Sequence, residues 1–390
     1  MHRSDSAALR PLAALPLPRL GILGGGQLAK MTASAAAQLG CEVVVLERQE
    51  DFPAQSVDTH ALIGDWNDPA RVAELAALVD VVTLENEFVE LAALDAAGGR
   101  NLHPSRATLA LVQDKLLQKQ AFAAAGLPLP RFAAAPTRED ALHFGFPAVL
   151  KKRRNGYDGK GNATVRRAEE LEAAWQALDG DRTPLLIEEF CDFARELATI
   201  VTRAADGSEA RYPVVETVQR EHICHRVVAP AVLPDERAAE AASIAARAVA
   251  VVGGVGSFGM ELFELRDGRL VINEIAPRVH NSGHYTIEAC ATSQFENHVR
   301  AVLGLPLGST RMRAPAAAMV NLLGFGDGSG VPFGLSEALR VAGAHLHLYG
   351  KSRSARGRKM GHVTALGATR EEALAIAQRA ADCLRFGGER

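Results

Sequence analysis

Cysteine and long apolar runs are both scarce in this 390-residue sequence. Its five cysteines are scattered and odd in number, and no two stand at C-x-x-C spacing, so neither a disulfide framework nor a zinc site is expected. Such cysteine usage is typical of the reducing cytoplasm, where we expect the protein to act. No apolar run approaches the roughly 18 residues that a membrane span needs, so no membrane association is expected.

A strong charge of one sign and a high aromatic content are lacking as well. The net charge is -3 and aromatic residues make up 5% of the chain, so neither a general nucleic-acid binder nor a binder of anionic membranes is expected. Near the N-terminus, Pro11, Pro16 and Pro18 interrupt a segment rich in Ala and Leu. Residues 1–18 are therefore interpreted as a disordered extension and not as a signal peptide.

The pattern of apolar residues predicts three parts, a combination of α/β and α+β. Residues 19–112 alternate strands and helices, as an open parallel sheet covered by helices does. Residues 113–308 begin with a helix and continue with many short strands between a few helices, an α+β pattern. Residues 309–390, after Gly304-Leu305-Pro306, form a smaller C-terminal part that closes with a helix.

A glycine turn lies at the start of the first part. Gly24-x-Gly26-x-x-Ala29 follows a predicted strand and opens a predicted helix, and Glu47 ends the next strand. In the dinucleotide fingerprint, such a helix N-terminus takes a pyrophosphate and the acid takes a ribose. An NAD-binding oxidoreductase is one interpretation of this turn, and a purely structural turn is another.

A cationic, glycine-rich hairpin is predicted in the second part. Four cations at 151–154 follow the apolar run 147–150, three glycines lie within 156–161, and the run 163–165 reads as the returning strand. Because glycines let backbone N–H groups approach a ligand and Lys adds a point charge, the tip is expected to be a mobile lid over phosphates. The order of residues is not that of a Walker A loop, and a solvated basic hairpin is the alternative.

Two glutamates are predicted to face each other farther along the chain. Asp267-Gly268 between apolar runs indicates a two-residue hairpin turn, which would place Glu261 opposite Glu274. The same register would pair Phe263 with Ile272 and Leu265 with Leu270. Like charges about 5 Å apart repel by roughly 3 kcal/mol, and a hard divalent cation offsets that repulsion. Oxygen ligands alone point to Mg²⁺ together with nucleotide phosphates, hence to ATP chemistry.

Several motifs together resemble one family. They are Gly24-Gly25-Gly26-Gln27-Leu28, the helix with Asp114-Lys115 and Gln118-Lys119, the hairpin 151–162, Ile187-Glu188-Glu189-Phe190, the strand 259–263, the run 273–284 (NEIAPRVHNSGH) and 357–362 (GRKMGH). The sequence resembles the 5-(carboxyamino)imidazole ribonucleotide synthases, members of the ATP-grasp superfamily, over about residues 19 to 380. The run 273–284 is the most specific of these motifs.

The resemblance implies a fold and a reaction. The fold is a Rossmann-like pre-ATP-grasp domain (19–112), an ATP-grasp domain (113–308) and a small C-terminal domain (309–390). The implied ligase uses ATP with Mg²⁺, two ions, to turn bicarbonate into carboxyphosphate, which carboxylates the exocyclic amine of 5-aminoimidazole ribonucleotide. The family also suggests a homodimer. A formate-using ATP-grasp ligase of purine synthesis and a non-catalytic nucleotide-binding regulator are the alternatives.

The same resemblance assigns roles to individual residues. Metal ligands are Glu261 and Glu274. Catalytic candidates are Tyr157, Asp158, Arg278, His280 and Asn281. ATP-binding candidates are Lys115, Lys151, Gly156, Gly159, Lys160, Gly161, Asn162, Glu188, Glu189, Phe190, Glu196, Gln219 and Asn273. Substrate-binding candidates are Gly26, Gln27, Leu28, Glu85, Ser282, Lys351 and Arg358. The chain departs from the family pattern at Ala355-Arg356 and at Asn86 and Phe88.

Overall fold

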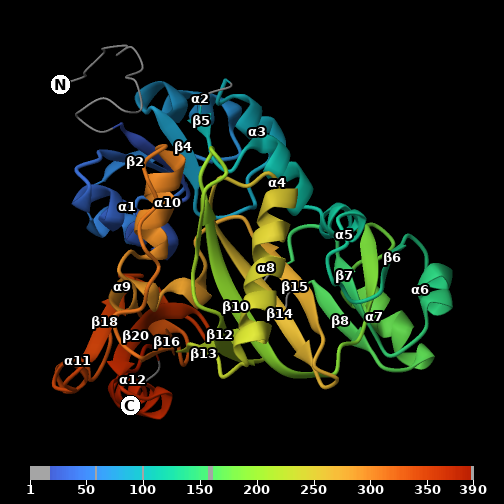
Figure 1. Ribbon diagram of the computed structural model, residues 1–390. Coiled ribbons are helices and arrows are strands. Elements are labelled where there is room, and N and C mark those ends of the chain that lie inside the picture. Colours follow the sequence, from blue (N-terminus) through green and yellow to red (C-terminus); the bar gives the residue numbers. More distant parts are fainter. Residues whose placement is uncertain (1–17, 58, 99–100, 157–160, 388–390) are drawn as a thin grey trace.

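The computed structural model describes residues 18–57, 59–98, 101–156 and 161–387 (Figure 1). Four sheets form its framework: a parallel sheet, a four-stranded antiparallel sheet, a long nine-stranded sheet and a two-stranded ribbon, β17 (Gly328–Ser329) with β19 (Arg353–Ser354). Figure 1 shows the four-stranded sheet at one side of the molecule, well apart from the parallel sheet. Residues 1–17 of the predicted extension, the tip of the cationic hairpin and the last three residues lie outside the described residues, whereas Pro18 is described and buried.

The N-terminal part is a five-stranded parallel sheet with the strand order β3-β2-β1-β4-β5. Strands β1, β2 and β4 are almost entirely buried because helices cover both faces, as the near-continuous Val and Leu runs predict. The elements are β1 (Leu20–Leu23), α1 (Gln27–Gln38), β2 (Val43–Glu47), η1 (Pro53–Ser56), β3 (His60–Ile63), α2 (Pro69–Leu78), β4 (Val81–Leu84), α3 (Leu91–Asp95), β5 (Asn101–Leu102) and α4 (Arg106–Val112).

The second part begins with a small antiparallel sheet in the order β6-β9-β7-β8. Two short helices pack on it around the buried Trp175, in a small core of its own. The elements are α5 (Lys115–Ala124), β6 (Phe132–Ala135), α6 (Arg138–Phe144), β7 (Ala148–Lys152), β8 (Asn162–Val165), η2 (Ala168–Glu170), α7 (Leu171–Ala177) and β9 (Leu185–Glu189). The predicted hairpin is thus present as β7 paired with β8.

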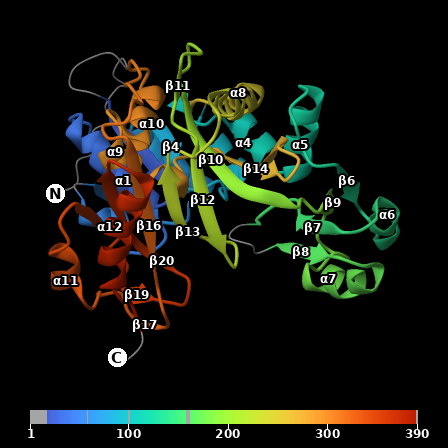
Figure 2. The ribbon, with the colours of Figure 1, turned by 60° about the horizontal axis from the view of Figure 1, so that its bottom comes forward.

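The nine-stranded sheet runs from β15 through β14, β10, β12, β13, β16 and β20 to β18, with β11 beside β10. Helix α8 packs on one stretch of it and α12 on another (Figures 1 and 2). Its elements are β10 (Phe193–Arg203), β11 (Glu209–Arg211), β12 (Val215–Arg220), β13 (Ile223–Ala229), α8 (Asp235–Val251), β14 (Gly256–Leu265), β15 (Leu270–Ala276), η3 (Asn281–Gly283), α9 (Thr286–Ala289), α10 (Gln294–Val302), β16 (Ala316–Leu323), α11 (Leu335–Leu339), β18 (Ala344–Leu348), β20 (Lys359–Gly367) and α12 (Arg370–Asp382).

The continuity of this sheet bears on the predicted boundary at 308/309. Strands β16, β18 and β20 lie after that boundary, yet β16 pairs with β13. The C-terminal part therefore shares a sheet with the second part instead of building its own, and the division of the chain into domains stays a prediction. Among the described residues, no helix is long and apolar enough to cross a membrane.

Candidate active site

The glycine turn between β1 and α1 is filled by two carboxylates of the protein. The Gly25 N–H group donates to Glu47 Oε2 at 2.7 Å. Glu85, at the end of β4, accepts from the N–H groups of Gly26 and, at 3.2 Å, Leu28. A Cβ at Gly26 would lie 2.1 Å from the Glu85 carboxylate, so only glycine fits there.

This arrangement bears on the predicted phosphate contact at the turn, which stays a prediction. The N–H groups of Gly26 and Leu28 already have an acceptor, so they do not offer a helix N-terminus to a phosphate or to the pyrophosphate of a dinucleotide. Burial raises the pKa of Glu85, while the two N–H donors oppose that shift. The group at the centre of the turn is therefore the carboxylate of Glu85. Contact of Gly26, Gln27 and Leu28 with the substrate through other atoms stays a prediction.

A buried ion triad lies where the small sheet meets α5. Glu188 on β9 has Lys151 Nζ of β7 at 2.8 Å from one oxygen and Lys119 Nζ of α5 at 3.1 Å from the other. The side chains of Lys119 and Glu188 are 2% and 4% exposed. Burial alone would raise the pKa of Glu188, but Lys151 and Lys119 hold it at about 2, so the carboxylate is ionised. The predicted ATP-contacting side chain of Glu188 is engaged by these two lysines in the structure.

The N-terminus of α5 anchors the base of the cationic hairpin. Asp114 caps the helix by accepting from the Leu116 N–H at 3.1 Å, and it takes Arg153 Nη2 at 2.6 Å. The Lys115 N–H donates to the Arg153 carbonyl at 2.9 Å. The Lys115 ammonium reaches across to Glu274 Oε1 at 2.5 Å. These contacts hold the cations of the hairpin beside the end of β15.

The predicted pairing of Glu261 with Glu274 is confirmed by the strand register. The register of the rest of the hairpin was wrong, because Phe263 faces Val271 and Leu265 bonds with Arg269. The turn has three residues, with Gly268 at φ +84°, and the extra residue is offset by a bulge in β15 between Ile272 and Glu274. The prediction missed both the extra turn residue and the bulge, and because each shifts the register by one residue in opposite directions, the pairing of Glu261 with Glu274 was still correct.

A third carboxylate shares the face of this pair. Ala198 of β10 lies opposite Glu261, and Glu196 is two residues away on the same strand, so its side chain points to the same side. Burial, followed by Glu274 and Glu196, raises the pKa of Glu261 to about 7. Burial also raises the pKa of Glu196 to about 7. Lys115 keeps the pKa of Glu274 below its usual value even though burial opposes this. Among the described residues, Glu274 pairs with Lys115, whereas Glu196 and Glu261 make no ion pair with a lysine or arginine.

Residues 277–284, which follow β15, lie beside the face that carries Glu261 and Glu274. Glu87 takes the Arg278 guanidinium through two contacts, at 2.6 and 3.2 Å. Gln294 fixes His280 by its backbone at both the N–H (2.9 Å) and the carbonyl (2.7 Å). Burial and the nearby Arg278 lower the pKa of His280 to about 3, so its imidazole is neutral. It lies 3.7 Å from Glu261 and 2.9 Å from the Ser282 hydroxyl.

The C-terminal part brings Lys351, a predicted substrate-binding residue, close to the glycine turn. Lys30 of α1 donates to the carbonyl of Leu348 at 3.0 Å, which docks α1 on the end of β18. Lys351 follows, donates to the Lys359 carbonyl at 2.8 Å, and is near enough to Glu85 to lower its pKa. Arg358 lies on an exposed loop and donates to the Arg353 carbonyl at 2.7 Å. The structure thus brings Lys351 and Glu85 together, and a shared phosphate contact with Arg358 stays a prediction.

The remaining predicted residues fall into two groups. Those in the described part of the chain lie on or beside the small and long sheets: Gly156, Gly161, Asn162, Glu189, Phe190, Gln219, Asn273, Asn281 and Ser282. Those outside the described residues are Tyr157, Asp158, Gly159 and Lys160. The roles assigned to both groups stay predictions.

Four residues that contact Glu188, Arg278, Asp114 or Asn281 were not themselves predicted as site residues. Lys119 completes the triad, Glu87 holds Arg278, Arg153 binds Asp114, and Asn321 exchanges two hydrogen bonds with Asn281 at 3.0 and 2.7 Å. Lys119 carried a signal in the sequence, since residues four apart on a helix share a face and Lys115 was already assigned to ATP. The others become visible only when distant segments are placed together.

The fold and this cluster of lysines and carboxylates define an ATP-grasp ligase. Three family models cover most of the chain: the ribonucleotide synthetase preATP-grasp domain matches residues 17–113, the ATP-grasp domain 120–295, and the phosphoribosylaminoimidazole carboxylase C-terminal domain 317–376. The chain is 46% identical over 363 residues to the N5-carboxyaminoimidazole ribonucleotide synthase of Synechococcus elongatus, an alignment that covers 91% of each chain. The chain belongs to the N5-carboxyaminoimidazole ribonucleotide synthase family.

Solved structures agree with this assignment. The N5-carboxyaminoimidazole ribonucleotide synthetase of Thermotoga maritima superposes with a TM-score of 0.86 at 39% identity, covering 96% of this chain and all of that one. The synthase of Aspergillus clavatus complexed with ATP gives 0.86 at 36% identity, covering 94% and 98%. The same enzyme with ADP and 5-aminoimidazole ribonucleotide gives 0.85 at 35% identity, covering 94% and 98%. The predicted ATP-grasp fold with its two flanking domains is confirmed, and the interpretation as an NAD-binding oxidoreductase was wrong.

Proposed function

We propose that the enzyme carboxylates the exocyclic amine of 5-aminoimidazole ribonucleotide, using ATP and bicarbonate through carboxyphosphate, to give 5-(carboxyamino)imidazole ribonucleotide, ADP and phosphate in purine biosynthesis. The observation that carries this proposal is the meeting of lysines from α5 and β7 with the carboxylates of β14 and β15. Relatives in complex with ATP, and with ADP and 5-aminoimidazole ribonucleotide, support the choice of substrates.

Lys115 and Lys151 are suited to the nucleotide phosphates. Both ammonium groups are largely buried, with side chains 16% and 13% exposed, and both are aligned by a carboxylate partner. Phosphoryl transfer depends mainly on positioning and on neutralising charge, and these cations serve both needs. Gly156, Gly161 and Asn162 would support the lid that covers the phosphates.

Glu261 and Glu274 fit a Mg²⁺ site. Among the described residues no group of three or more His, Cys, Asp or Glu side chains is placed to hold a metal ion by itself. Mg²⁺ commonly takes only one or two carboxylates and completes its shell with phosphate oxygens and water, so a pair suffices. Burial, followed by the charges of Glu274 and Glu196, raises the pKa of Glu261 to about 7, so a bound cation would favour its ionised form. When bound, Mg²⁺ would neutralise phosphate charge during transfer.

The residues after β15 are proposed to hold bicarbonate or carboxyphosphate. Arg278 supplies a charged donor fixed by Glu87, Ser282 is oriented by His280, and Asn281 is oriented by Asn321. Since His280 is neutral, it can accept or donate one hydrogen bond without adding charge. Asp158 is the proposed base for the amine, with Tyr157 beside it.

The remaining proposals concern the setting of the enzyme. The five cysteines form no disulfide bond within the described part of the chain, and we propose a reducing cytoplasmic location. A homodimer and the three-domain division at 112/113 and 308/309 are proposed from the family resemblance.

An ADP-release assay with each substrate omitted in turn tests the function. We expect ADP formation to require both 5-aminoimidazole ribonucleotide and bicarbonate. Equal turnover without the ribonucleotide would contradict the proposal. Replacing bicarbonate by formate distinguishes the rival formate-using ligase, which would keep its activity. A nucleotide-binding regulator would release no ADP under any of these conditions.

A further inference from the structure

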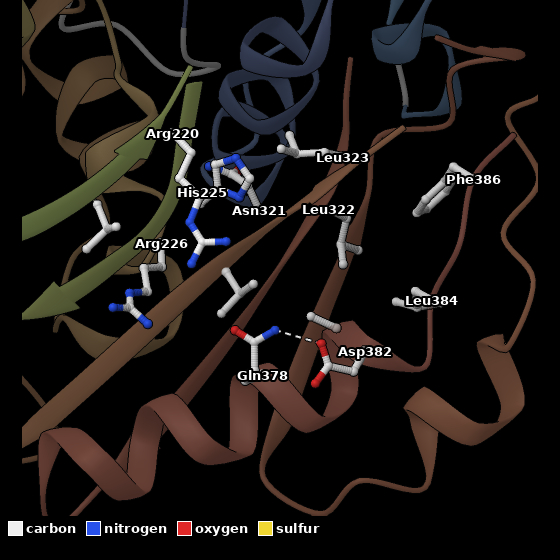
Figure 3. A pocket seen from close by; sticks show the side chains of 13 residues that line it. Arg220, His225, Arg226, Asn321, Leu322, Leu323, Gln378, Asp382, Leu384 and Phe386 are labelled. Atoms are coloured by element: carbon white, nitrogen blue, oxygen red, sulfur yellow. Dashed lines mark hydrogen bonds between the residues drawn. The ribbon is translucent and has the colours of Figure 1, made fainter. Parts of the chain in front are cut away.

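A cavity of about 380 Å³ lies between the long sheet and the C-terminal end of α12 (Figure 3). Apolar side chains of β12, β16 and the C-terminal segment line part of it, and Gln378 and Asp382 of α12 close one side. Arg220, His225 and Arg226 bring three nitrogen-rich side chains to the opposite wall, as Figure 3 shows. Asn321, which also lines the cavity, hydrogen-bonds to Asn281 of the active site, whereas Arg220, Arg226 and Gln378 are not among the proposed site residues.

The sheet separates this cavity from the active site. On β13 and β16, Val228 and Val320 pack against α12, whereas Val227 and Met319 pack on the opposite face against Tyr285, beside the proposed bicarbonate segment. Side chains alternate along a strand, so Arg226 lies on the α12 face with Val228. A ligand bound here would thus be distinct from a nucleotide held by Lys115 and Lys151.

The charge in the cavity is not balanced. Within the described chain neither Arg220 nor Arg226 makes an ion pair or a side-chain hydrogen bond, whereas Arg195 and Arg138 each contact two carboxylates. The carboxylate Asp382 accepts a hydrogen bond from Gln378 at 2.7 Å instead of contacting an arginine. Two guanidinium groups therefore border the cavity without an ion-pair partner among the described residues, and the carboxylate of Asp382 lines its other side.

The chemistry of the walls indicates the ligand class. A guanidinium presents parallel N–H donors that match phosphate oxygens, and two of them balance a phosphate dianion. The volume is within the range of small-molecule sites, which combine apolar walls with a few placed polar groups. Val320, Leu322 and Leu384 supply such a wall.

We propose that this cavity binds a small phosphate monoester with a compact apolar body, through Arg220 and Arg226. The phosphate takes the two guanidinium groups, and the body lies against the apolar wall. This site is additional to the proposed nucleotide and ribonucleotide sites and does not depend on the reaction proposed above.

Isothermal titration calorimetry of the full-length protein, saturated with Mg-ADP, tests the site with phenyl phosphate as the probe. We expect one equivalent to bind, with inorganic phosphate binding more weakly and benzyl alcohol not at all. The double variant R220Q/R226Q should bind phenyl phosphate at least about tenfold more weakly. The control R237Q removes an arginine of α8 that pairs with Glu240, and it should bind as the wild type does. Equal affinity of the double variant, or no binding with Mg-ADP present, would overturn the proposal.

A second variant separates occupation of the cavity from a general effect of charge. Gln378→Trp keeps the net charge but places a large side chain in the cavity, so it should abolish phenyl phosphate binding while circular dichroism stays that of the wild type. If the Trp variant folds and binds phenyl phosphate unchanged, the ligand lies elsewhere and the proposal is wrong.

Discussion

Two regions of this enzyme are predicted from the sequence to bind ligands, a phosphate at the glycine turn and a metal ion at the glutamate pair, yet they differ in how their charges are balanced. In the glycine turn, Glu47 and Glu85 satisfy the N–H groups of Gly25, Gly26 and Leu28. Across β10, β14 and β15, Glu196 and Glu261 share a buried face with no lysine or arginine in ion-pair contact among the described residues, and both have a pKa raised to about 7.

The difference separates a structural motif from a ligand site. A donor set that already has acceptors gains little from a new anion, whereas buried charges without partners are costly until a ligand arrives. The unbalanced face is therefore where we propose that metal and phosphates bind. The N–H groups of the glycine turn instead hold the carboxylate of Glu85 in place.

The largest expected effect concerns the triad that orders Lys151. Glu188→Gln leaves Lys119 and Lys151 buried beside a neutral amide, so the free energy of unfolding should fall by roughly 3–5 kcal/mol. Urea denaturation measures this change. Glu189→Gln, the next residue on β9, is the matched control and should change stability little. If Glu188→Gln lowers the free energy of unfolding by less than about 1 kcal/mol, Lys119 and Lys151 do not depend on the charge of Glu188 for their stability.

The next effect addresses the unbalanced face directly. Glu274→Gln removes a proposed metal ligand and the partner of Lys115, so turnover in the ADP-release assay should fall by roughly 10²-fold or more. Asp267→Asn, at the exposed turn of the same hairpin, should keep wild-type turnover. Unchanged activity of Glu274→Gln would mean that this face does not serve phosphoryl transfer.

Removing a carboxylate from the balanced turn should convert it into an anion site. Glu85→Ala leaves the N–H groups of Gly26 and Leu28 without an acceptor and should destabilise the protein by roughly 1–3 kcal/mol. Added sulfate should then raise the Tm of Glu85→Ala more than that of the wild type, because the freed helix N-terminus accepts it. Glu50→Ala, in an exposed loop, controls for the lost charge. Equal sulfate responses would contradict the contrast between the two regions.

The smallest effect is a pH dependence at Glu261. Its folded-state pKa is about 7 against 4.5 for the free side chain, so its contribution to stability is complete below pH 4.5 and is lost as pH rises to 7. From pH 5 to 8 in metal-free buffer, Glu261→Gln should gain roughly 1–3 kcal/mol in free energy of unfolding relative to the wild type. Mg-ADP should reverse this difference by stabilising only the wild type at pH 8. Parallel pH profiles of the two proteins would contradict the raised pKa.

Local patterns predicted most of the elements around the site. Continuous Val and Leu runs gave the buried strands β1, β2 and β4, and Asp114 with the following apolar positions gave α5. The short or exposed strands β3, β5 and β6 carry no such signal, because edge strands lack a buried face on both sides. The Glu261–Glu274 pairing was found although the hairpin turn was taken as one residue too short.

The glycine turn marks the boundary between what sequence and tertiary structure decide. The sequence alone determined that a strand, three glycines and a helix follow one another, and that two glutamates meet on a hairpin, because those relations are local. Only the tertiary structure decided that Glu85, 59 residues from Gly26, fills the turn, and that Lys119 is buried against Glu188. Whether a donor or a charge is open to a ligand depends on partners that the chain brings from a distance.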